Sequence, residues 1–297
     1  MIEVRNVSKR YGETMAVDRV SFDVRPGLVT GFLGPNGSGK STTMRLILGL
    51  DRPTSGYATV HGKPYRELAA PLREVGALLD AKAVHGNRTA RRHLTWLARA
   101  GGIPLRRVDE VLDLVGLTEA ADRKVRGFSL GMSQRLGLAA ALLGEPGTLL
   151  LDEPVNGLDP DGIRQVRVLL RTLAAEGRTV LVSSHLMAEM EETADHVLVI
   201  GDGRLMADTP LAELTRRHGG GRVRVISPEA GRLDPVLAAA GGRIRSQPDG
   251  AIEVSGLTAA EVGDAAAAAG ITLHELTPLR GTLEAAFLDL VETGAKS

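Results

Sequence analysis

The run from Gly34 to Thr42 has the residue types and the spacing of a phosphate-binding loop. It matches the pattern G-x-x-x-x-G-K-[ST], with the second glycine, the lysine and the hydroxyl at Gly39, Lys40 and Ser41. Glycines let the backbone N–H groups point at phosphate oxygens, which larger residues would block. The lysine amine can reach the β- and γ-phosphates of a nucleotide, and the serine hydroxyl can bind Mg²⁺.

The flanks of this loop favour phosphate binding over a plain glycine-rich turn before a helix. Residues 28–33 predict a buried strand that enters the loop, and residues 43–48 predict an apolar helix that leaves it. The N-terminus of such a helix adds the positive end of its dipole at the phosphates. The residues expected to bind the nucleotide here are Gly34, Pro35, Asn36, Gly37, Ser38, Gly39, Lys40, Ser41 and Thr42.

Two acidic residues follow a second apolar run. The run 148–152 shows no polar alternation, which is typical of a central parallel strand, and it ends at Asp152. A carboxylate delivered beside a phosphate loop can hold Mg²⁺. Glu153 cannot point the same way, because side chains along a strand alternate, and it could orient or deprotonate the attacking water. A helix or turn cap is the structural alternative, and the phosphate loop favours catalysis over it.

The composition excludes several classes of protein. The chain has 297 residues, no cysteine, and 36 Lys+Arg against 36 Asp+Glu. The zero formal charge argues against broad nucleic-acid binding, and the lack of cysteine excludes disulfide and iron–sulfur chemistry. The N-terminus lacks the apolar core of a signal peptide, and the longest apolar stretch, 136–143, is far shorter than a membrane span. We therefore expect a chain that does not itself cross a bilayer.

The remaining elements predict an α/β fold with a helical insertion. Residues 1 to about 30 alternate apolar and polar side chains, which indicates a small antiparallel meander before the loop. Residues from about 82 to 146 are expected to be mostly helical, with Thr89 as an N-cap. Further strands are expected at 148–152, 179–183 and 196–200, the last turning into a hairpin through 207.

A glycine run, His218–Gly221, predicts a linker to a smaller domain. The expected order beyond it is strand, helix, strand, strand, helix, strand, which suits a ferredoxin-like unit. These elements are predicted at 223–226, 235–240, 243–246, 252–254, 259–269 and 271–275, before a last helix with Leu283, Phe287 and Leu290 on one face. The tail shows no catalytic constellation, so we interpret it as a docking or regulatory module.

Several motifs occur in an order that resembles the nucleotide-binding subunit of an ABC (ATP-binding cassette) transporter. They are Tyr11, the phosphate loop, 128–135 (FSLGMSQR), 149–154 (LLLDEP), 156–159 (NGLD) and 183–185 (SSH). The resemblance covers residues 1 to about 215. The tail, with its closing segment 282–288 (TLEAAFL), resembles ATPase subunits of bacterial drug exporters.

The resemblance implies a role for each matching residue. Tyr11 would stack on adenine, unless it is a turn tyrosine that packs on the meander. Ser129 and Gly131 would bind the γ-phosphate of ATP held by a second subunit, at the N-terminus of a helix that favours anions; a plain helix cap at Ser129 is the alternative. Asp159 would lie in the loop that joins the two sites, and His185 would contact the γ-phosphate. The expected catalytic residues are Glu153, His185 and Lys40.

Two departures from the family pattern stand out. In the signature motif, usually Leu-Ser-Gly-Gly-Gln, Leu130 and Met132 replace the first glycine and the glutamine. The backbone donors could survive this change, but the glutamine contact is lost. After the strand 74–79 the family has a glutamine, and this chain has Asp80. A carboxylate there could approach Mg²⁺ while it adds negative charge near the phosphates, so Asp80 joins Ser41 and Asp152 as an expected metal ligand.

The expected fold is therefore an α/β P-loop NTPase of the ABC cassette type. Residues 1–217 would form the cassette, with an antiparallel β subdomain, a parallel-sheet core and a helical subdomain at about 82–146. Residues 218–297 would form a small α+β C-terminal domain. The resemblance implies an ATPase with ATP and Mg²⁺ as cofactors, pairing with a second ATPase subunit as a homodimer.

The resemblance also implies a partner protein and a cellular location. The chain would drive a separate integral membrane permease as a peripheral subunit on the cytoplasmic face of the cell membrane, exporting drugs or other small hydrophobic or amphiphilic molecules, with no nucleic acid bound. The alternative is a soluble ABC-type ATPase that acts on ribosomes or nucleic acid. Such proteins usually carry two cassettes or a long coiled-coil insertion, and this sequence shows neither. A GTPase or small-molecule kinase lacks support, since no N-K-x-D motif occurs.

Overall fold

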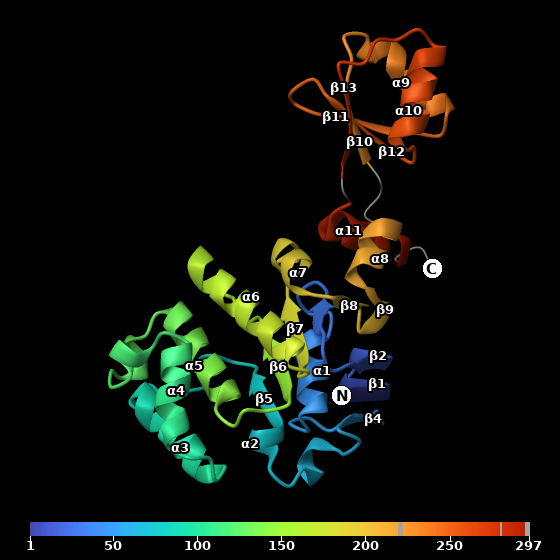
Figure 1. The fold of residues 1–297 in the computed structure, drawn as a ribbon. Helices are drawn as coiled ribbons and strands as arrows, with labels where there is room; N and C mark the ends of the chain where they lie inside the picture. Colours follow the sequence, from blue (N-terminus) through green and yellow to red (C-terminus); the bar gives the residue numbers. More distant parts are fainter. Residues whose placement is uncertain (219–221, 280, 295–297) are drawn as a thin grey trace. The chain divides into compact units, whose positions relative to one another are not determined.

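The computed structural model describes residues 1–218, 222–279 and 281–294. The chain divides into two compact units, Met1–Thr209 and Pro210–Ser297 (Figure 1). The domain boundary expected at residue 217 stays a prediction. Of the expected linker, His218 ends a helix and residues 219–221 lie outside the described residues.

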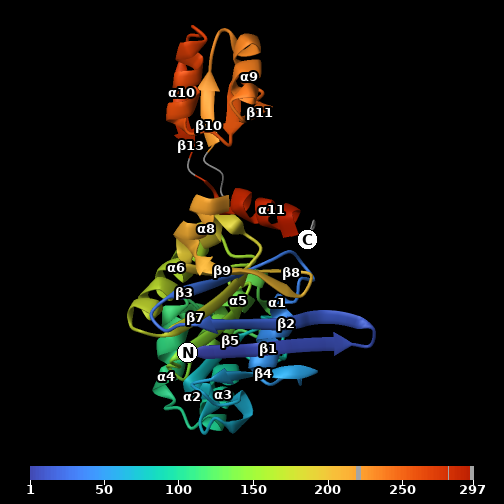
Figure 2. The same cartoon turned by 90° about the vertical axis from the view of Figure 1, so that its right-hand side faces the viewer.

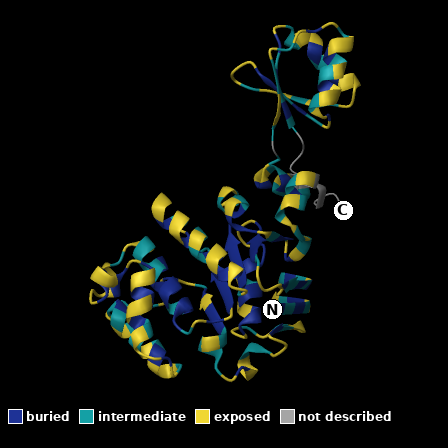
Figure 3. Cartoon of the chain, in the orientation of Figure 1, coloured by how far each residue is buried: buried dark blue, intermediate teal, exposed yellow. Residues whose placement is uncertain are grey.

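A six-stranded sheet forms the centre of the first unit, in the order β5-β6-β7-β3-β8-β9, with parallel pairing from β5 through β8. Its strands are β3 (Val29–Leu33), β5 (Val75–Leu78), β6 (Thr148–Asp152), β7 (Thr179–Ser184), β8 (His196–Gly201) and β9 (Arg204–Pro210). Every residue of β3 and of β7 is buried (Figure 3). Continuous burial is what parallel strands show when both faces of their sheet are covered, so the apolar runs in the sequence were sufficient to locate them.

Helices cover both faces of this sheet (Figure 1). On one face, α6 (Pro160–Ala175) and α7 (Met187–Thr193) contact β3 and β7. On the other face lies α1 (Lys40–Ile47), whose Met44 and Ile47 share one core with Phe32 and Leu150 of the sheet. The helix that follows the phosphate loop is thus fixed by apolar burial, which is worth about 1.5–3 kcal/mol for each such side chain.

An antiparallel sheet in the order β2-β1-β4 closes this core from outside (Figure 2). Its strands are β1 (Ile2–Tyr11), β2 (Thr14–Val24) and β4 (Ser55–Val60). The hairpin of β1 and β2 is the predicted meander, but its third strand comes from beyond α1 and pairs with β1. No apolar pattern predicted this partner strand, because β4 is exposed over half its length.

The segment predicted to be mostly helical contains three α-helices, α3 (Ala90–Ala100), α4 (Arg106–Leu114) and α5 (Leu130–Leu142). The N-cap predicted at Thr89 is confirmed, since its side chain accepts a hydrogen bond from the N–H of Arg92 at 3.2 Å. α5 packs against β5, which ties the helical part to the central sheet. Shorter helices are α2 (Pro71–Glu74), η1 (Tyr65–Glu67), η2 (Thr118–Ala120) and η3 (Val125–Gly127).

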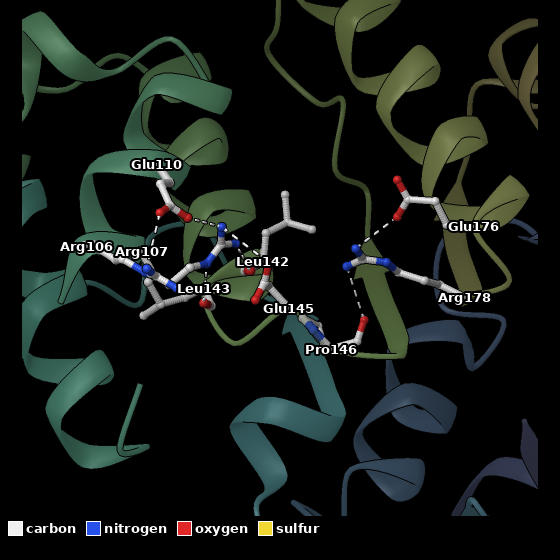
Figure 4. Close-up of polar contacts among 9 residues, drawn as sticks. All are labelled: Arg106, Arg107, Glu110, Leu142, Leu143, Glu145, Pro146, Glu176 and Arg178. Atoms are coloured by element: carbon white, nitrogen blue, oxygen red, sulfur yellow. Dashed lines mark hydrogen bonds and ion pairs between the residues drawn. The ribbon is translucent and has the colours of Figure 1, made fainter. Parts of the chain in front are cut away.

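Arg107 of α4 closes the C-terminal end of α5 (Figure 4). Its guanidinium donates to the carbonyl oxygens of Leu142 and Leu143, both at 3.4 Å. Carbonyls in the last turn of a helix have no helical N–H partner, and a cation there also suits the helix dipole. Ion pairs with Glu110 and Glu145 hold the guanidinium in place. This end of α5 is therefore anchored to α4.

The second unit contains a four-stranded antiparallel sheet in the order β11-β12-β10-β13. Its elements are α8 (Leu211–His218), β10 (Arg222–Ile226), α9 (Ala230–Ala239), β11 (Arg243–Ser246), β12 (Ile252–Ser255), α10 (Ala259–Ala268), β13 (Glu275–Leu279) and α11 (Leu283–Gly294). α8, which we did not predict, is in contact with α11. Within the described ranges, no helix is both long enough and apolar enough to span a bilayer.

The helix expected at 235–240 was misplaced. It begins at Ala230 and contains Pro235. Leu233 and Leu237 are fully buried on either side of the proline, and their burial outweighs the one hydrogen bond that proline cannot donate.

The last strand of the tail was also misplaced. The segment expected at 271–275 is a strand only from Glu275, and β13 continues to Leu279. The pairing of β13 with β10 sets this position, with Ile226 opposite Glu275. Ile271 instead follows the end of α10, where its N–H donates to the carbonyl of Ala266.

Candidate nucleotide-binding site

Three neighbouring strands bring the predicted chemistry to one edge of the central sheet. β7 lies between β3 and β6, and its Ser183 pairs in register with Phe32 on one side and Asp152 on the other. The carboxyl ends of the three strands therefore carry the phosphate loop, His185 and Glu153 side by side. The crevice outside such strand ends is where open α/β sheets bind ligands.

The phosphate loop needs its glycines for geometric reasons. A Cβ on Gly34 would lie 2.3 Å from the carbonyl oxygen of Ile200, and one on Gly39 would lie 2.6 Å from that of Ala16. Gly39 also has a φ of 105°, and Gly37 has 81°, which side chains rarely adopt. Gly39 caps α1 without a side-chain hydrogen bond, so the first N–H groups of the helix are left for an anion.

Lys40 is buried at the start of α1, with 6% of its surface exposed. Its Nζ donates to the carbonyl oxygens of Gly34 at 2.6 Å and Pro35 at 3.0 Å, which curls the side chain back over the loop. Burial lowers the pKa of Lys40, and the nearby carboxylates of Glu153 and Asp152 oppose this by raising it. The site thus contains a partly desolvated cation, where its attraction to phosphate is stronger than in water.

Asp152 is held by two hydroxyl groups. Ser41 Oγ donates to its Oδ2 at 2.5 Å, and Ser183 Oγ donates to its Oδ1. A hydroxyl and a carboxylate oxygen in contact are the ligands that Mg²⁺ takes from P-loop proteins, with waters and phosphate oxygens completing the octahedron. In the described part of the chain no cluster of three His, Cys, Asp or Glu residues could hold a metal by itself. The donor set therefore fits a metal shared with a nucleotide.

Glu153 has a left-handed backbone, with a φ of 50°. Its N–H donates to Ser183 Oγ at 3.0 Å, and its carbonyl oxygen accepts from Nε2 of Gln134 at 2.8 Å. Its Oε2 lies 2.7 Å from Nδ1 of His185. A non-glycine residue in this region persists only where its surroundings fix it, and here hydrogen bonds fix the backbone from two sides and the carboxylate from a third.

A cavity of about 210 Å³ lies over the loop. It is lined by Ala16, Asn36, Gly37, Gly39, Lys40, Ser41, Thr42, Asp152 and Glu153. Eight of these residues belong to the predicted site or to its catalytic pair, and Ala16 is an addition. A larger groove of about 490 Å³ lies between α5 and α6, but it is mostly apolar, and its lining includes no residue of the phosphate loop and no carboxylate.

Nine predicted residues lie outside this lining: Gly34, Pro35, Ser38, His185, Tyr11, Asp80, Ser129, Gly131 and Asp159. Tyr11 is 46% exposed, and its hydroxyl donates to Asp51 at 2.8 Å. Asp80 is exposed, and its Oδ1 accepts from the N–H of Lys82. Their predicted contacts with adenine and Mg²⁺ stay predictions.

Two of these residues, Ser129 and Asp159, cap helices. Ser129 caps α5 by accepting from the N–H of Met132 at 3.2 Å, and Asp159 caps α6 by accepting from the N–H of Gly162 at 3.0 Å. Gly131 lies beside the 156–159 loop, where an added Cβ would be 2.9 Å from the carbonyl oxygen of Gly157. The plain cap that the sequence left open at Ser129 is thus present, Asp159 caps a helix as well, and contacts across a dimer stay predictions.

Sequence reasoning missed three members of the site. Ser183 belongs to the motif 183–185, and its place at the end of a predicted strand was a usable signal for a role beside Asp152. Gln134 is a buried polar residue on an otherwise apolar face of α5, which the pattern also shows. Ala16 has no chemistry of its own, and no signal in the sequence could have found it.

Comparison with known proteins places the chain among similar molecules. The model of the ABC transporter family matches residues 17–156, and that of a domain of unknown function (DUF8746) matches residues 221–284. The bacitracin transport ATP-binding protein BcrA of Bacillus licheniformis is 42% identical over 221 residues, 73% of this chain and 72% of that protein. The Nod factor export ATP-binding protein I of Burkholderia orbicola (strain AU 1054) is 36% identical over 244 residues, 80% of each chain.

Solved structures show the same fold. The dimeric structure of MJ0796, a bacterial ABC transporter cassette, has a TM-score of 0.65 at 26% identity and covers 71% of this chain and 99% of its own. A post-hydrolysis state of that cassette bound to ADP and Pi has a TM-score of 0.64 at 25% identity, with the same coverage.

A phosphate loop between a central strand and a helix, with a carboxylate at the end of a nearby strand, defines a P-loop nucleotide-binding protein. Within that class, the chain belongs to the ABC transporter family: it is the ATP-binding subunit of such a transporter and an ATPase. The expected cassette fold with a small C-terminal α+β domain is confirmed.

Proposed function

We propose that ATP binds with its phosphates in the cavity above α1. The observation that carries this proposal is the contact of Ser41 with Asp152 beside the free N-terminus of α1. Mg²⁺ would be held by these two oxygen ligands and by phosphate oxygens, and it would neutralise charge as the γ-phosphate leaves. Lys40 would exchange its carbonyl partners for phosphate oxygens.

Hydrolysis then depends on a water aligned with the γ-phosphate. Glu153 lines the cavity and would serve as the base or orienting group for that water. His185 holds the carboxylate from the other side, through the contact between its Nδ1 and Oε2 of Glu153. The pair is positioned by the ends of neighbouring strands, a more rigid support than a loop.

Two copies of the chain would complete each site. The N-terminus of α5, capped by Ser129 and followed by Gly131, offers N–H groups and a positive dipole end to the γ-phosphate bound by the other copy. Asp159 lies beside this helix, with its Oδ1 3.8 Å from Nη2 of Arg135. The dimeric structure of the similar cassette MJ0796 supports this arrangement. Loss of the γ-phosphate would release the dimer.

The work of this ATPase would be export through a separate membrane permease, at the cytoplasmic face of the membrane. Similar proteins are named for bacitracin transport and Nod factor export, so the cargo proposed is an antibiotic or another amphiphilic molecule. The second unit, with its β-α-β-β-α-β order, would be a ferredoxin-like docking or regulatory module.

The hydrolytic role of Glu153 is tested by Glu153→Gln, which keeps the size of the side chain and removes its charge. We expect phosphate release to fall by a factor of about 10² or more, with ATP binding retained. Glu176→Gln, a charge removed from an exposed position after α6, serves as the matched control and should keep the wild-type rate. Hydrolysis at the wild-type rate in Glu153→Gln would overturn the assignment.

The transport role is tested by purification of the tagged chain from detergent-solubilised membranes of its own cell. A polytopic membrane protein recovered in constant proportion supports the proposal, and the ATPase rate should rise when the pair is reconstituted. Recovery of ribosomal RNA or DNA instead would favour the soluble alternative.

A further inference from the structure

The helix that begins at the signature motif, α5, is joined to Glu153 of the same chain by one buried side chain. We call α5 the signature helix. Gln134, in the second turn of α5, donates from Nε2 to the carbonyl oxygen of Glu153 at 2.8 Å. Only 6% of the Gln134 surface is exposed. A hydrogen bond in such surroundings is stronger than in water and costly to lose, because the carbonyl left behind has no water to replace it.

The other end of the Gln134 amide makes this contact unusual. Its Oε1 is buried without a hydrogen-bond partner among the described residues. A buried amide with half of its capacity unused is unfavourable for folding alone, and such groups in native proteins call for an explanation. A methionine or leucine would fill the same space without that cost. The presence of an amide at this position is therefore explained by its one hydrogen bond, whose acceptor is the carbonyl oxygen of Glu153.

That bond acts on a backbone that needs support. Glu153 has a left-handed φ of 50°, a conformation that costs about 1–3 kcal/mol outside glycine. Its N–H is held by Ser183 of β7, and its carbonyl by Gln134 of α5. The backbone of Glu153, which lines the cavity, is thus held by one contact from the sheet and one from α5.

The start of α5 lies close to the segment 153–159 at two further points. Arg135, the next residue, directs Nη2 toward Oδ1 of Asp159 at 3.8 Å. One turn earlier, Gly131 approaches Gly157 so closely that an added Cβ would lie 2.9 Å from its carbonyl oxygen. A small shift of the helix would therefore be transmitted to this segment, because packed contacts of this kind do not deform continuously.

We propose that Gln134 is a positioning residue that couples the N-terminus of α5 to the carboxylate of Glu153. The inference rests on the proposed function, in which that helix end faces the nucleotide of the second copy while Glu153 faces the nucleotide of its own. An anion that draws Ser129 toward it shifts α5, and Gln134 carries the shift to the Glu153 carbonyl. Each site thereby senses whether the other is occupied.

The test is Gln134→Met, which keeps the length of the side chain and removes the donor together with the unpaired oxygen. We expect kcat for ATP hydrolysis to fall by about tenfold or more, because a catalytic group displaced by about 1 Å can cost a factor of 10². KM and the affinity for a fluorescent ATP analogue should stay within about twofold of wild type, since no phosphate contact is lost.

A second variant keeps the proposal testable if Gln134→Met folds poorly. In Gln134→Glu the side chain donates to the Glu153 carbonyl when protonated and repels it when ionised, and burial raises the pKa of such a carboxyl. The ratio of its kcat to that of wild type should therefore fall as pH rises from about 6 to 9. A role in packing alone predicts no such slope.

Gln165→Met serves as the matched control, because Gln165 is an exposed glutamine of α6 that contacts Arg135 and not Glu153. It should keep wild-type kcat and KM. Wild-type kcat in Gln134→Met, or a flat ratio in Gln134→Glu, overturns the inference. Failure here is separate from failure of the proposed function: if Glu153→Gln abolishes hydrolysis while Gln134→Met leaves it intact, Glu153 keeps its role and only the coupling is lost.

Discussion

The hydroxyl of Ser41 donates to Oδ2 of Asp152 at 2.5 Å, although the two residues lie 111 positions apart in the sequence. The contact joins the first turn of α1 to the end of β6, with β7 between β3 and β6 in the sheet. Ser183 of β7 holds the other oxygen of the same carboxylate. The two oxygens that we propose as ligands of a divalent cation are thus fixed before a nucleotide arrives, so little ordering is left to be done on binding.

Hydrolysis should depend on Mg²⁺ through this pair. Removal of divalent cations with EDTA is expected to stop phosphate release, and added Mg²⁺ to restore it, because the metal offsets the charge on the leaving phosphate. Asp152→Asn should raise the Mg²⁺ concentration needed for half-maximal rate by about tenfold or more, since the amide loses the ligand charge. The rate measured against free Mg²⁺ reports both effects. An unchanged Mg²⁺ requirement in Asp152→Asn would contradict this metal site.

The loop lysine should carry much of the affinity for phosphate. Lys40→Met removes a desolvated cation from the cavity, and hydrogen bonds to charged groups contribute about 1.5–3 kcal/mol each. We expect the dissociation constant for ATP, measured by titration calorimetry, to rise by about tenfold to a hundredfold. Lys63→Met, at an exposed turn between β4 and η1, should leave the affinity unchanged. Equal affinities for ATP in the two variants would show that Lys40 does not contribute to ATP binding.

The histidine beside Glu153 should affect turnover more than binding. His185→Ala removes the group that holds Oε2 of Glu153 at 2.7 Å, so the carboxylate gains rotamers that do not face the cavity. We expect kcat to fall by about 10²-fold with a small change in the affinity for ATP. His274→Ala, an exposed histidine of the second unit, controls for the loss of an imidazole. A kcat within twofold of wild type would show that Glu153 needs no such support.

The stability of the first unit should depend on pH through His93 of α3. Burial lowers the pKa of His93, and Arg88 lowers it further; its Nδ1 is buried without a partner among the described residues. The unfolded chain, with a histidine pKa near about 6.5, therefore takes up more protons than the folded chain as pH falls through this value. The contribution of His93 to stability is present above about pH 6.5 and is lost below it.

His93→Gln should accordingly reduce the drop in thermal midpoint between about pH 7.5 and pH 5.5, because glutamine does not titrate. Circular dichroism at the two pH values measures the drop, and His274→Gln provides the comparison. A drop of wild-type size in His93→Gln would show that its protonation costs the fold nothing.

Much of the fold and site followed from local patterns. The runs 28–33 and 148–152 predicted β3 and β6 because strands covered on both faces must be apolar throughout. The glycines at 34 and 39 predicted the loop, because their spacing belongs to a backbone that few other residues can adopt. The predicted loop then indicated a role for Asp152 beside the phosphates of a nucleotide. Each of these features depends on residues that lie close together in the sequence.

The rest depends on contacts between distant segments. β4 was missed because its pairing with β1 is a tertiary choice, and β13 was misplaced because the register with β10 decides where that strand begins. The left-handed backbone of Glu153 could not be predicted either. It is stabilised by Ser183 and Gln134. No pattern of adjacent residues predicts that these three residues are in contact.

In the proposed mechanism, two copies of this chain enclose ATP between them. Glu153→Gln is expected to bind ATP without hydrolysing it, so the measurement is the molar mass of this variant by light scattering coupled to gel filtration, with and without Mg·ATP. We expect the mass of one chain, 31.3 kDa, without nucleotide and twice that mass with Mg·ATP, reverting when EDTA is added. A single-chain mass under saturating Mg·ATP would contradict it.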